Sequence, residues 1–244
     1  MLNFNDKDLP KFVKVKRVNI SALPSINTNL KANAGGYGVL SGESTFGEKV
    51  ISADVSIVIP SGYSLQKCAR ELAVWLQGNN FKLSPLIISD DAEVHYMAKI
   101  SNSVAISDLI FAGEGTLEFV VPSGVAVGNS VKTYTGTTKS TFTYGGTAKA
   151  YPKIELTLNS QISNGVINIT NVKTGEKISL AGTFQAGNKI KIDCSKHLVK
   201  VNDKLQLNML SLDSQFFGTV VGANEISCSI SDSSLKIIFQ ERFL

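Results

Sequence analysis

One stretch of the sequence has helical spacing, while the apolar residues elsewhere mostly alternate in steps of two. Within residues 64–77 the apolar side chains recur three and four positions apart, so they form one stripe along a helix. Ser64 can cap the start of this helix, and Gly78 can end it. A stripe of this kind has to be buried on a sheet, which constrains the strands around it. It consists of Leu65, Ala69, Leu72 and Leu76, with Cys68 and Trp75 beside them.

Strand candidates lie on both sides of the predicted helix. The clearest alternates from Val50 to Ile59 and is ended by Pro60 and Gly62. One helix flanked by strands predicts an α+β domain in which the helix covers a face of an antiparallel sheet. The other candidates are Phe12 to Ile20, Leu86 to Ile88, Val94 to Ile100, Ala105 to Phe111 and Thr116 to Val121, the last two separated by AGEG.

A change in composition divides the chain. Residues 124–146 are poor in large aliphatic side chains and rich in Gly, Ser and Thr, which predicts a boundary near Gly136. We therefore expect one domain at residues 1–136 and a second at residues 137–244. The second has only short strands separated by turns, including turns at Val201 to Asp203 and Gly222 to Asn224, which favours a β-sandwich. Its strand candidates are Ile154 to Leu158, Val166 to Ile169, Lys177 to Leu180, Ile190 to Ile192, Leu205 to Met209, Ile226 to Ile230 and Leu235 to Phe239.

Charge and composition argue against several classes of partner. The formal net charge is +4, and the Lys and Arg residues are scattered along the sequence, so we predict no nucleic-acid specificity. The N-terminus has no signal-peptide pattern, and no apolar run reaches the roughly 20 residues of a membrane span. We therefore expect synthesis in a cytoplasm and no membrane insertion. Cys68, Cys194 and Cys228 are expected to be free, partly buried thiols.

Asp90, Asp91, Glu93 and His95 form the densest group of potentially reactive side chains. They could serve as metal ligands or as an acid/base pair. The alternative is a polar turn that leads into a strand, with Asp91, Glu93 and His95 on one face. The polar turn is favoured, because the sequence shows no second cluster of ligands.

The remaining motifs are incomplete. Cys194 and His197 in CSKH resemble half of a zinc site, but nothing nearby supplies the other half. The glycine clusters lack the strand, loop and helix context of a phosphate site, so they are predicted to be turns or a flexible arm. They are Gly35, Gly36 and Gly38, and then Gly113 and Gly115. With two His and no GxSxG, P-loop or HExxH motif, we predict no enzyme, no cofactor and no metal site.

Several ordered pieces of the sequence carry a family resemblance. They are FVKVKRVNISALPSI, TFGEKVISADVSIVIPSG, ELAVWL, ISDDAEVHYMAKI, GEGTLEFVVPSGVAVG and GGTAKAYPKIEL. In this order and spacing they resemble the distal tail protein (Dit) of long-tailed (siphovirus) phages of Gram-positive bacteria. The resemblance runs from the N-terminus to about Ser160, and the rest of the chain agrees in length and β character.

The resemblance implies a mainly β virion structural protein. Dit proteins combine an N-terminal β-sandwich, which has one helix and a projecting hairpin arm, with a peripheral galectin-like β-sandwich. By this resemblance Asn33 to Lys49 is the arm, Ser64 to Gln77 is the packing helix and Thr137 to Leu244 is the outer domain. The implied role is a hexameric baseplate hub, in a single or paired ring, within the host adsorption apparatus. The implied partners are the tail tube protein, a tail-associated lysin or fibre protein, and a receptor-binding protein.

The residues of the arm allow two interpretations. A ring built by head-to-tail contacts needs two different complementary patches on each subunit, and an arm carrying Tyr37 and Phe46 could bury these aromatics on a neighbour. A mobile loop whose aromatics pack internally is equally compatible with the sequence. The family resemblance favours the arm.

The main alternative function is a carbohydrate-binding β-sandwich module that acts in host-surface attachment. Carbohydrate sites present exposed aromatic platforms, whereas this domain has no Trp and several of its aromatics alternate with core positions. The available aromatics are Phe142, Tyr144, Tyr151, Phe184, Phe216, Phe217, Phe239 and Phe243. A third possibility is a hydrolase that uses Asp91, Glu93 or His95.

Overall fold

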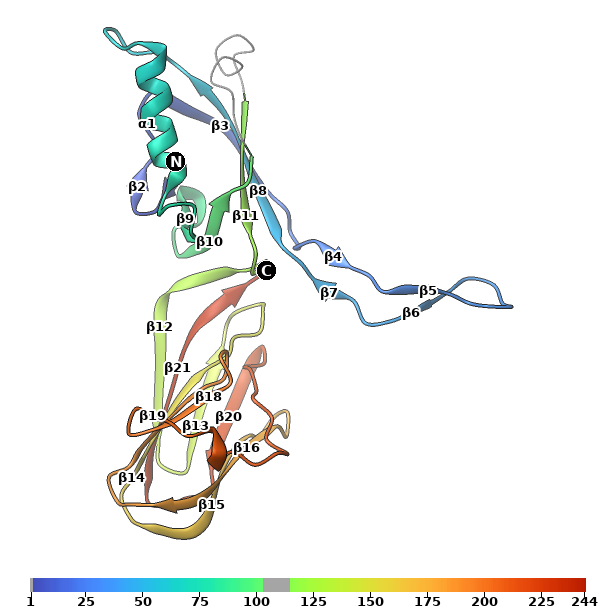
Figure 1. Ribbon diagram of the computed structural model, residues 1–244, viewed down its shortest axis with the longest axis vertical. Coiled ribbons are helices and arrows are strands. Elements are labelled where there is room, and N and C mark those ends of the chain that lie inside the picture. Colours follow the sequence, from blue (N-terminus) through green and yellow to red (C-terminus); the bar gives the residue numbers. More distant parts are fainter. Residues whose placement is uncertain (1, 103–114) are drawn as a thin grey trace. The chain divides into compact units, whose positions relative to one another are not determined.

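The structure, a computed structural model, describes residues 2–102 and 115–244 (Figure 1). The strand that we expected at Ala105 to Phe111 lies outside these residues. Within them the chain is mainly β, as predicted, with one α-helix, α1 (Leu65–Gln77). No helix in the described ranges has the length and hydropathy needed to cross a membrane.

The chain divides into two compact units. The first comprises Met1–Val127 together with Leu244, and the second comprises Gly128–Phe243. The division falls inside a long strand, β12 (Ala126–Gly136), and not at the end of that strand, where the composition suggested a boundary. Each unit has its own core.

Two antiparallel sheets that share β10 build the first unit. One has the strand order β2-β1-β9-β10 and the other has the order β10-β11-β8-β3. The alternating sequence explains these strands, since β8 buries Ile51, Ala53 and Val55 on one face. The strands are β1 (Leu2–Phe4), β2 (Lys7–Asp8), β3 (Val13–Ile20), β8 (Lys49–Ile57), β9 (Ser84–Ile88), β10 (Val94–Ile100) and β11 (Gly115–Val121).

The helix packs on the sheets through its single Trp. The indole of Trp75 contacts Phe4 of β1 and Phe119 of β11 edge-on, with ring centroids 5.7 and 6.2 Å apart. Its N–H donates to the carbonyl of Lys7 at 2.9 Å, so the polar atom of this buried ring is paired. These contacts tie α1 to both sheets, as the amphipathic pattern required.

Local sequence determines both ends of α1. The Oγ of Ser64 accepts a hydrogen bond from the Lys67 N–H at 3.2 Å, and Gly78 ends the helix with a φ of 54°. The buried face is narrower than the predicted stripe, because Leu65 stands in the first turn and is 36% exposed. The stripe consists of buried Cys68, Leu72 and Trp75, half-buried Ala69 and Leu76, and exposed Leu65.

The second unit is a sandwich of two antiparallel sheets. One has the order β19-β18-β17-β14-β21-β12 and the other has the order β13-β20-β15-β16, and aliphatic and aromatic side chains fill the space between them. Its further strands are β13 (Lys139–Tyr144), β14 (Lys153–Leu158), β15 (Ile162–Asn171), β16 (Lys177–Phe184), β17 (Lys189–Asp193), β18 (Leu198–Val201), β19 (Lys204–Leu205), β20 (Gly222–Cys228) and β21 (Ser233–Phe243).

The stretch that is rich in Gly, Ser and Thr contributes to β12 and β13, where Tyr134 stacks on Phe142 with ring centroids 5.0 Å apart. Two local predictions in this unit are wrong. The strand expected at Leu205 to Met209 is a short 3-10 helix, η2 (Leu207–Met209), after β19. The turn expected at Gly222 to Asn224 begins β20, with the positive φ of Gly222 placed at the strand entrance.

Candidate assembly surface

A hairpin arm extends from the first unit between β3 and β8 (Figure 1). Two short ladders build it, the first between β4 (Ile26–Asn27) and β7 (Thr45–Phe46) and the second between β5 (Leu30–Ala32) and β6 (Val39–Ser41). Two backbone hydrogen bonds close the base, from the Ser25 N–H to the Glu48 carbonyl at 2.9 Å and from the Gly47 N–H to the Ser25 carbonyl at 2.7 Å. We define the arm as residues 25–48.

The arm is longer than the sequence indicated. The family resemblance placed it at Asn33 to Lys49, which omits the outgoing strands β4 and β5. Asn and Gly residues around these strands gave them the composition of a turn, and pairing with the returning strands overrides that local preference. The glycines of GGYG form the tip, where Gly35 and Gly38 have φ values of 84° and 83°.

Nothing in the described structure covers the arm. Every residue from 25 to 46 is exposed, although several are large and apolar. A free two-stranded hairpin is marginally stable in water, so apolar residues on both faces gain little unless another surface covers them. The exposed apolar side chains, with their exposed fractions, are Ile26 (51%), Leu30 (56%), Tyr37 (104%), Val39 (59%), Leu40 (59%) and Phe46 (58%).

The two aromatics singled out from the sequence lie at opposite ends of the arm. Tyr37 stands at the tip, and Phe46 stands near the base in register with Ile26. The cross-strand pair of Ile26 and Phe46 is therefore a compact exposed apolar spot, and sequence reasoning missed Ile26. The sequence did contain a signal for this pair, because Ile26 and Phe46 lie at nearly equal distances along the chain from the glycine-rich tip.

The base of the arm is pinned by a close backbone contact. Gly124 has a φ of 69°, and a Cβ at this position would lie 2.6 Å from the carbonyl oxygen of Gly47 and 3.0 Å from Pro24. Only glycine fits here without displacing the arm. Lys49 lies beside this contact and is the first residue of β8. Its side chain is 1% exposed, and burial lowers the pKa of its ammonium group.

The acidic cluster lies in a polar turn. Asp90 and Asp91 belong to the 3-10 helix η1 (Ser89–Asp91), and Glu93 ends the turn before β10; all three are exposed. Burial, and then the nearby charge of Asp91, raises the pKa of Tyr96. Within the described ranges, no group of three His, Cys, Asp or Glu residues has an arrangement that could hold a metal ion.

Cys194 and His197 do not meet. Cys194 is fully buried in the second core, and burial raises the pKa of its thiol to about 12. His197 is exposed and stacks on Phe216 with ring centroids 4.8 Å apart. The half zinc site suggested by CSKH is therefore split between the core and the surface.

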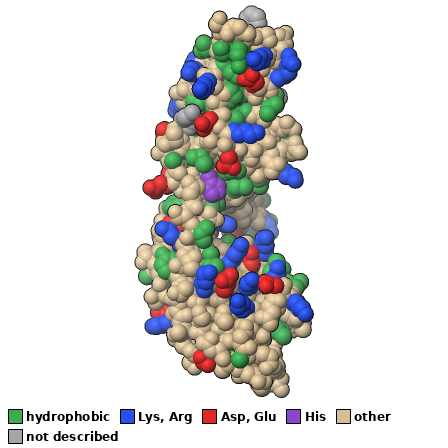
Figure 2. All heavy atoms as spheres, turned by 90° about the vertical axis from the view of Figure 1, so that its left-hand side faces the viewer, with side chains coloured by type: hydrophobic (Ala, Val, Ile, Leu, Met, Phe, Trp, Pro, Cys, Tyr) green, Lys and Arg blue, Asp and Glu red, His purple; other side chains and the backbone are tan. Residues whose placement is uncertain are grey.

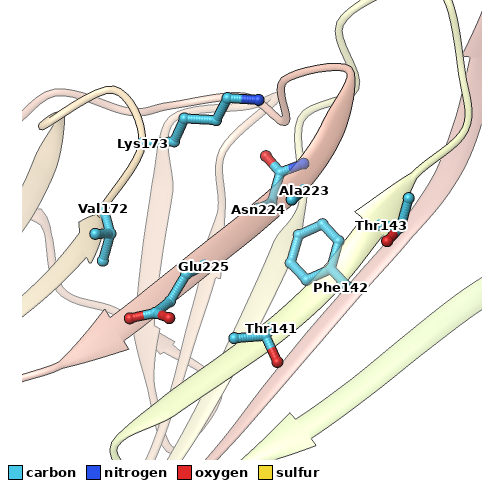
Figure 3. Close-up of a pocket in the computed structure, with 8 residues that line it drawn as sticks. All are labelled: Thr141, Phe142, Thr143, Val172, Lys173, Ala223, Asn224 and Glu225. Atoms are coloured by element: carbon cyan, nitrogen blue, oxygen red, sulfur yellow. The ribbon is translucent and has the colours of Figure 1, made fainter.

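The second unit carries an open groove of about 580 Å³ between β13, β20 and the segment that follows β15 (Figure 3). The one aromatic side chain that lines it, Phe142, is 6% exposed and belongs to the core. The groove therefore lacks an aromatic platform for a sugar ring. Its lining residues are Thr141, Phe142 and Thr143 of β13, Val172 and Lys173 after β15, and Ala223, Asn224 and Glu225 of β20.

Other candidate platform residues are also mostly internal. Of the aromatics expected in this domain, Tyr151 is the one that is exposed, at 38%. The buried ones are Phe142, Tyr144, Phe184, Phe217 and Phe239, and the half-buried ones are Phe216 and Phe243.

Comparison with known proteins identifies both halves of the chain. A family model described as a phage tail protein RIFT-related domain matches residues 7–121, and one described as the C-terminal domain of a siphovirus-type tail component matches residues 145–243. No curated protein sequence matches the chain.

Solved structures give the fold of the whole chain. The crystal structure of the Dit protein of phage SPP1, described as a paradigm of the hub adsorption apparatus in Gram-positive infecting phages, matches with a TM-score of 0.80 and 15% identity. That match covers 100% of this chain and 98% of the SPP1 protein. The activated baseplate of phage P2 with Ca matches over 98% of each chain at 9% identity and a TM-score of 0.42. With both halves matched by siphovirus tail families and one Dit fold along its length, the chain belongs to the siphovirus distal tail proteins.

Proposed function

We propose that this chain is the ring-forming hub of a siphovirus tail tip, and that the arm of each subunit packs on the next subunit. The observation that carries the proposal is the arm, whose large apolar side chains are all exposed. A protein that exposes such a segment has an apolar partner surface for it. The proposed assembly is a homohexameric ring, either single or paired.

A head-to-tail ring suits this geometry. In a closed ring each subunit offers two different patches, so an arm on one side requires a receiving surface on the other side. The short ladders of β4 with β7 and of β5 with β6 would be held by a neighbour more firmly than by their own hydrogen bonds. The arm is therefore expected to order fully on assembly.

The hub role defines the proposed partners and location. The ring would join the tail tube protein to a tail-associated lysin or fibre protein. The second unit of each subunit would carry a receptor-binding protein. The chain would be made in the host cytoplasm and would end in the virion tail tip, without enzymatic activity. The SPP1 Dit protein, described as a hub adsorption apparatus, supports this role through its shared fold.

The first test is the mass of the purified chain by light scattering on a sizing column, followed by negative-stain imaging. Hexamers or paired hexamers, seen as rings with a central hole, are expected. A protein that stays monomeric at high concentration and binds glycans would contradict the hub and favour the carbohydrate-binding alternative.

A further inference from the structure

The outward face of the sheet β18-β17-β14-β21 carries a lattice of charged side chains. Strand register places Glu155 opposite both Lys236 and Lys191, and it places Lys191 opposite Lys200. In the next row Lys153 stands opposite Asp193. We call this surface the lysine face, and it consists of Lys153, Lys189, Lys191, Lys196, Lys200 and Lys236, with Glu155 and Asp193. Lys and acidic side chains lie intermingled on the second unit in Figure 2.

Partners within the chain already engage the acids of this region. Glu155 pairs with Lys236 at 3.5 Å, and Asp203 pairs with Lys191 at 2.7 Å. The Oδ1 of Asp193 accepts the backbone N–H groups of Ser195 and Lys196, each at 3.1 Å, so this carboxylate holds a turn.

Four lysines of the face have no ion-pair partner in the part of the chain that the structure describes. They are Lys153, Lys189, Lys196 and Lys200, and all four are exposed. Lys200 also stands directly opposite Lys191, whose charge Asp203 already engages.

Three of these lysines, Lys153, Lys196 and Lys200, line a hollow of about 290 Å³ together with the ion-paired Lys191. Half-buried Leu198 also lines it, so the hollow offers an apolar surface among ammonium groups. Glu155 and Asp193 line it as well. Leu205, which is 54% exposed, stands in register with Lys200 and extends the apolar surface at the edge of the sheet.

We propose that the lysine face is a docking surface for an acidic segment of another protein, in which carboxylates flank one apolar side chain. The free ammonium groups of Lys153, Lys196 and Lys200 would contact the carboxylates, and the apolar side chain would enter the hollow beside Leu198. A uniform polyanion fits less well, since Glu155 and Asp193 would repel it and it has nothing to place on an apolar surface. The proposal concerns a surface outside the arm, so it stands whether or not the chain forms rings.

The probe is a fluorescein-labelled acidic peptide in which Glu and Asp residues surround one central Trp, and the measurement is fluorescence anisotropy with the full chain. The variant Lys153→Gln/Lys196→Gln/Lys200→Gln is expected to weaken binding about tenfold or more, because each lost charge contact changes the affinity by a small factor. The charge-matched control, Lys139→Gln/Lys173→Gln/Lys177→Gln, removes the same charge elsewhere in the second unit and is expected to leave binding within about twofold.

Two further probes distinguish an acidic peptide that carries an apolar side chain from a simple polyanion. Replacing the central Trp of the peptide by Gly is expected to weaken binding, because the apolar contact is lost. Equal losses in both triple variants, or no binding by the wild-type chain, would overturn the proposal. Tighter binding of inorganic polyphosphate than of the peptide, lost in the same lysine variant, would replace the protein partner by a polyanion.

Discussion

At the scale of single residues, the second core shows how strictly polar atoms are paired. Tyr144 is 1% exposed, and its hydroxyl accepts the Arg242 N–H at 2.9 Å and donates to the Ala148 carbonyl. Burial is the main cause of its raised pKa. Ser140 is the exception, because its buried Oγ has no hydrogen-bond partner within the described ranges. A buried hydroxyl without a partner costs free energy.

Ser140→Ala is therefore expected to raise the free energy of unfolding by up to about 1 kcal/mol, since it removes an unpaired hydroxyl. Differential scanning calorimetry would measure the change. The matched control is Ser179→Ala, because Ser179 is also buried but donates to the Asn168 Oδ1 at 2.8 Å. The free energy of unfolding of this control should fall by about 1 kcal/mol or more, because a buried hydrogen bond is lost. Destabilisation of similar size in both variants would contradict the prediction.

The three thiols are expected to be unreactive in the folded chain, since Cys68, Cys194 and Cys228 are all buried. Burial raises the pKa of Cys194 to about 12 and also raises that of Cys228. A raised pKa stabilises the fold below the ordinary thiol pKa, and this contribution is lost as the pH rises towards the folded value. Stability should thus fall from about pH 9 upwards.

Titration with Ellman's reagent at neutral pH provides the measurement for the thiols. Slow labelling of the native protein and full labelling in guanidinium are expected. Rapid labelling of one thiol in the native state would show that its buried position is wrong.

At the scale of elements, the helix depends on a narrower face than its sequence indicated. Leu72 is 2% exposed at the centre of that face, and Leu65 is 36% exposed at its edge. Leu72→Ala is expected to lower the free energy of unfolding by about 2–5 kcal/mol, because it opens a cavity. Leu65→Ala should cost less than about 1 kcal/mol. Urea unfolding followed by the fluorescence of Trp75, the single Trp of the chain, reports on this unit.

The packing of the arm base depends on one glycine, Gly124. The substitution Gly124→Ala is expected to lower the free energy of unfolding by about 2 kcal/mol or more, because a Cβ would meet the Gly47 carbonyl and the backbone would keep an unfavourable positive φ. Gly62→Ala is the matched control, with a φ of 81° and no atom within 4 Å of the added Cβ. Gly62→Ala should lower the free energy of unfolding by about 1 kcal/mol, because only the unfavourable positive φ acts at that position. Equal losses in unfolding free energy would argue against a steric lock at the arm base.

At the scale of the whole molecule, the arm is expected to matter for assembly and not for folding. The double variant Ile26→Ser/Phe46→Ser changes an exposed pair, so its thermal unfolding should match that of the wild type. Its rings should be lost or weakened in light scattering and in negative-stain images, because the apolar contact with a neighbour is removed.

The matched control for assembly is Leu212→Ser/Val221→Ser, which changes two exposed apolar residues of the second unit. It should assemble as the wild type does. Rings of normal stability from the arm variant would show that the pair of Ile26 and Phe46 lies outside the subunit contact.

Sequence by itself determined the features that depend on neighbours along the chain. The helix from its Ser64 cap to Gly78, strand β10 at Val94–Ile100 and the change to an all-β second half all follow from short periods and capping residues. These are local preferences, and each is repeated over enough residues to outweigh its surroundings.

Only the tertiary structure decided which distant residues share a surface. Pairing across strands turned an Asn-rich segment into half of the arm and joined Ile26 to Phe46. It also gathered lysines that are scattered in the sequence onto one sheet face, where Lys191 and Lys200 became neighbours. Strand register is a long-range property, because it is set by burial of the opposite face of each strand, and the spacing of exposed residues along the chain does not encode it.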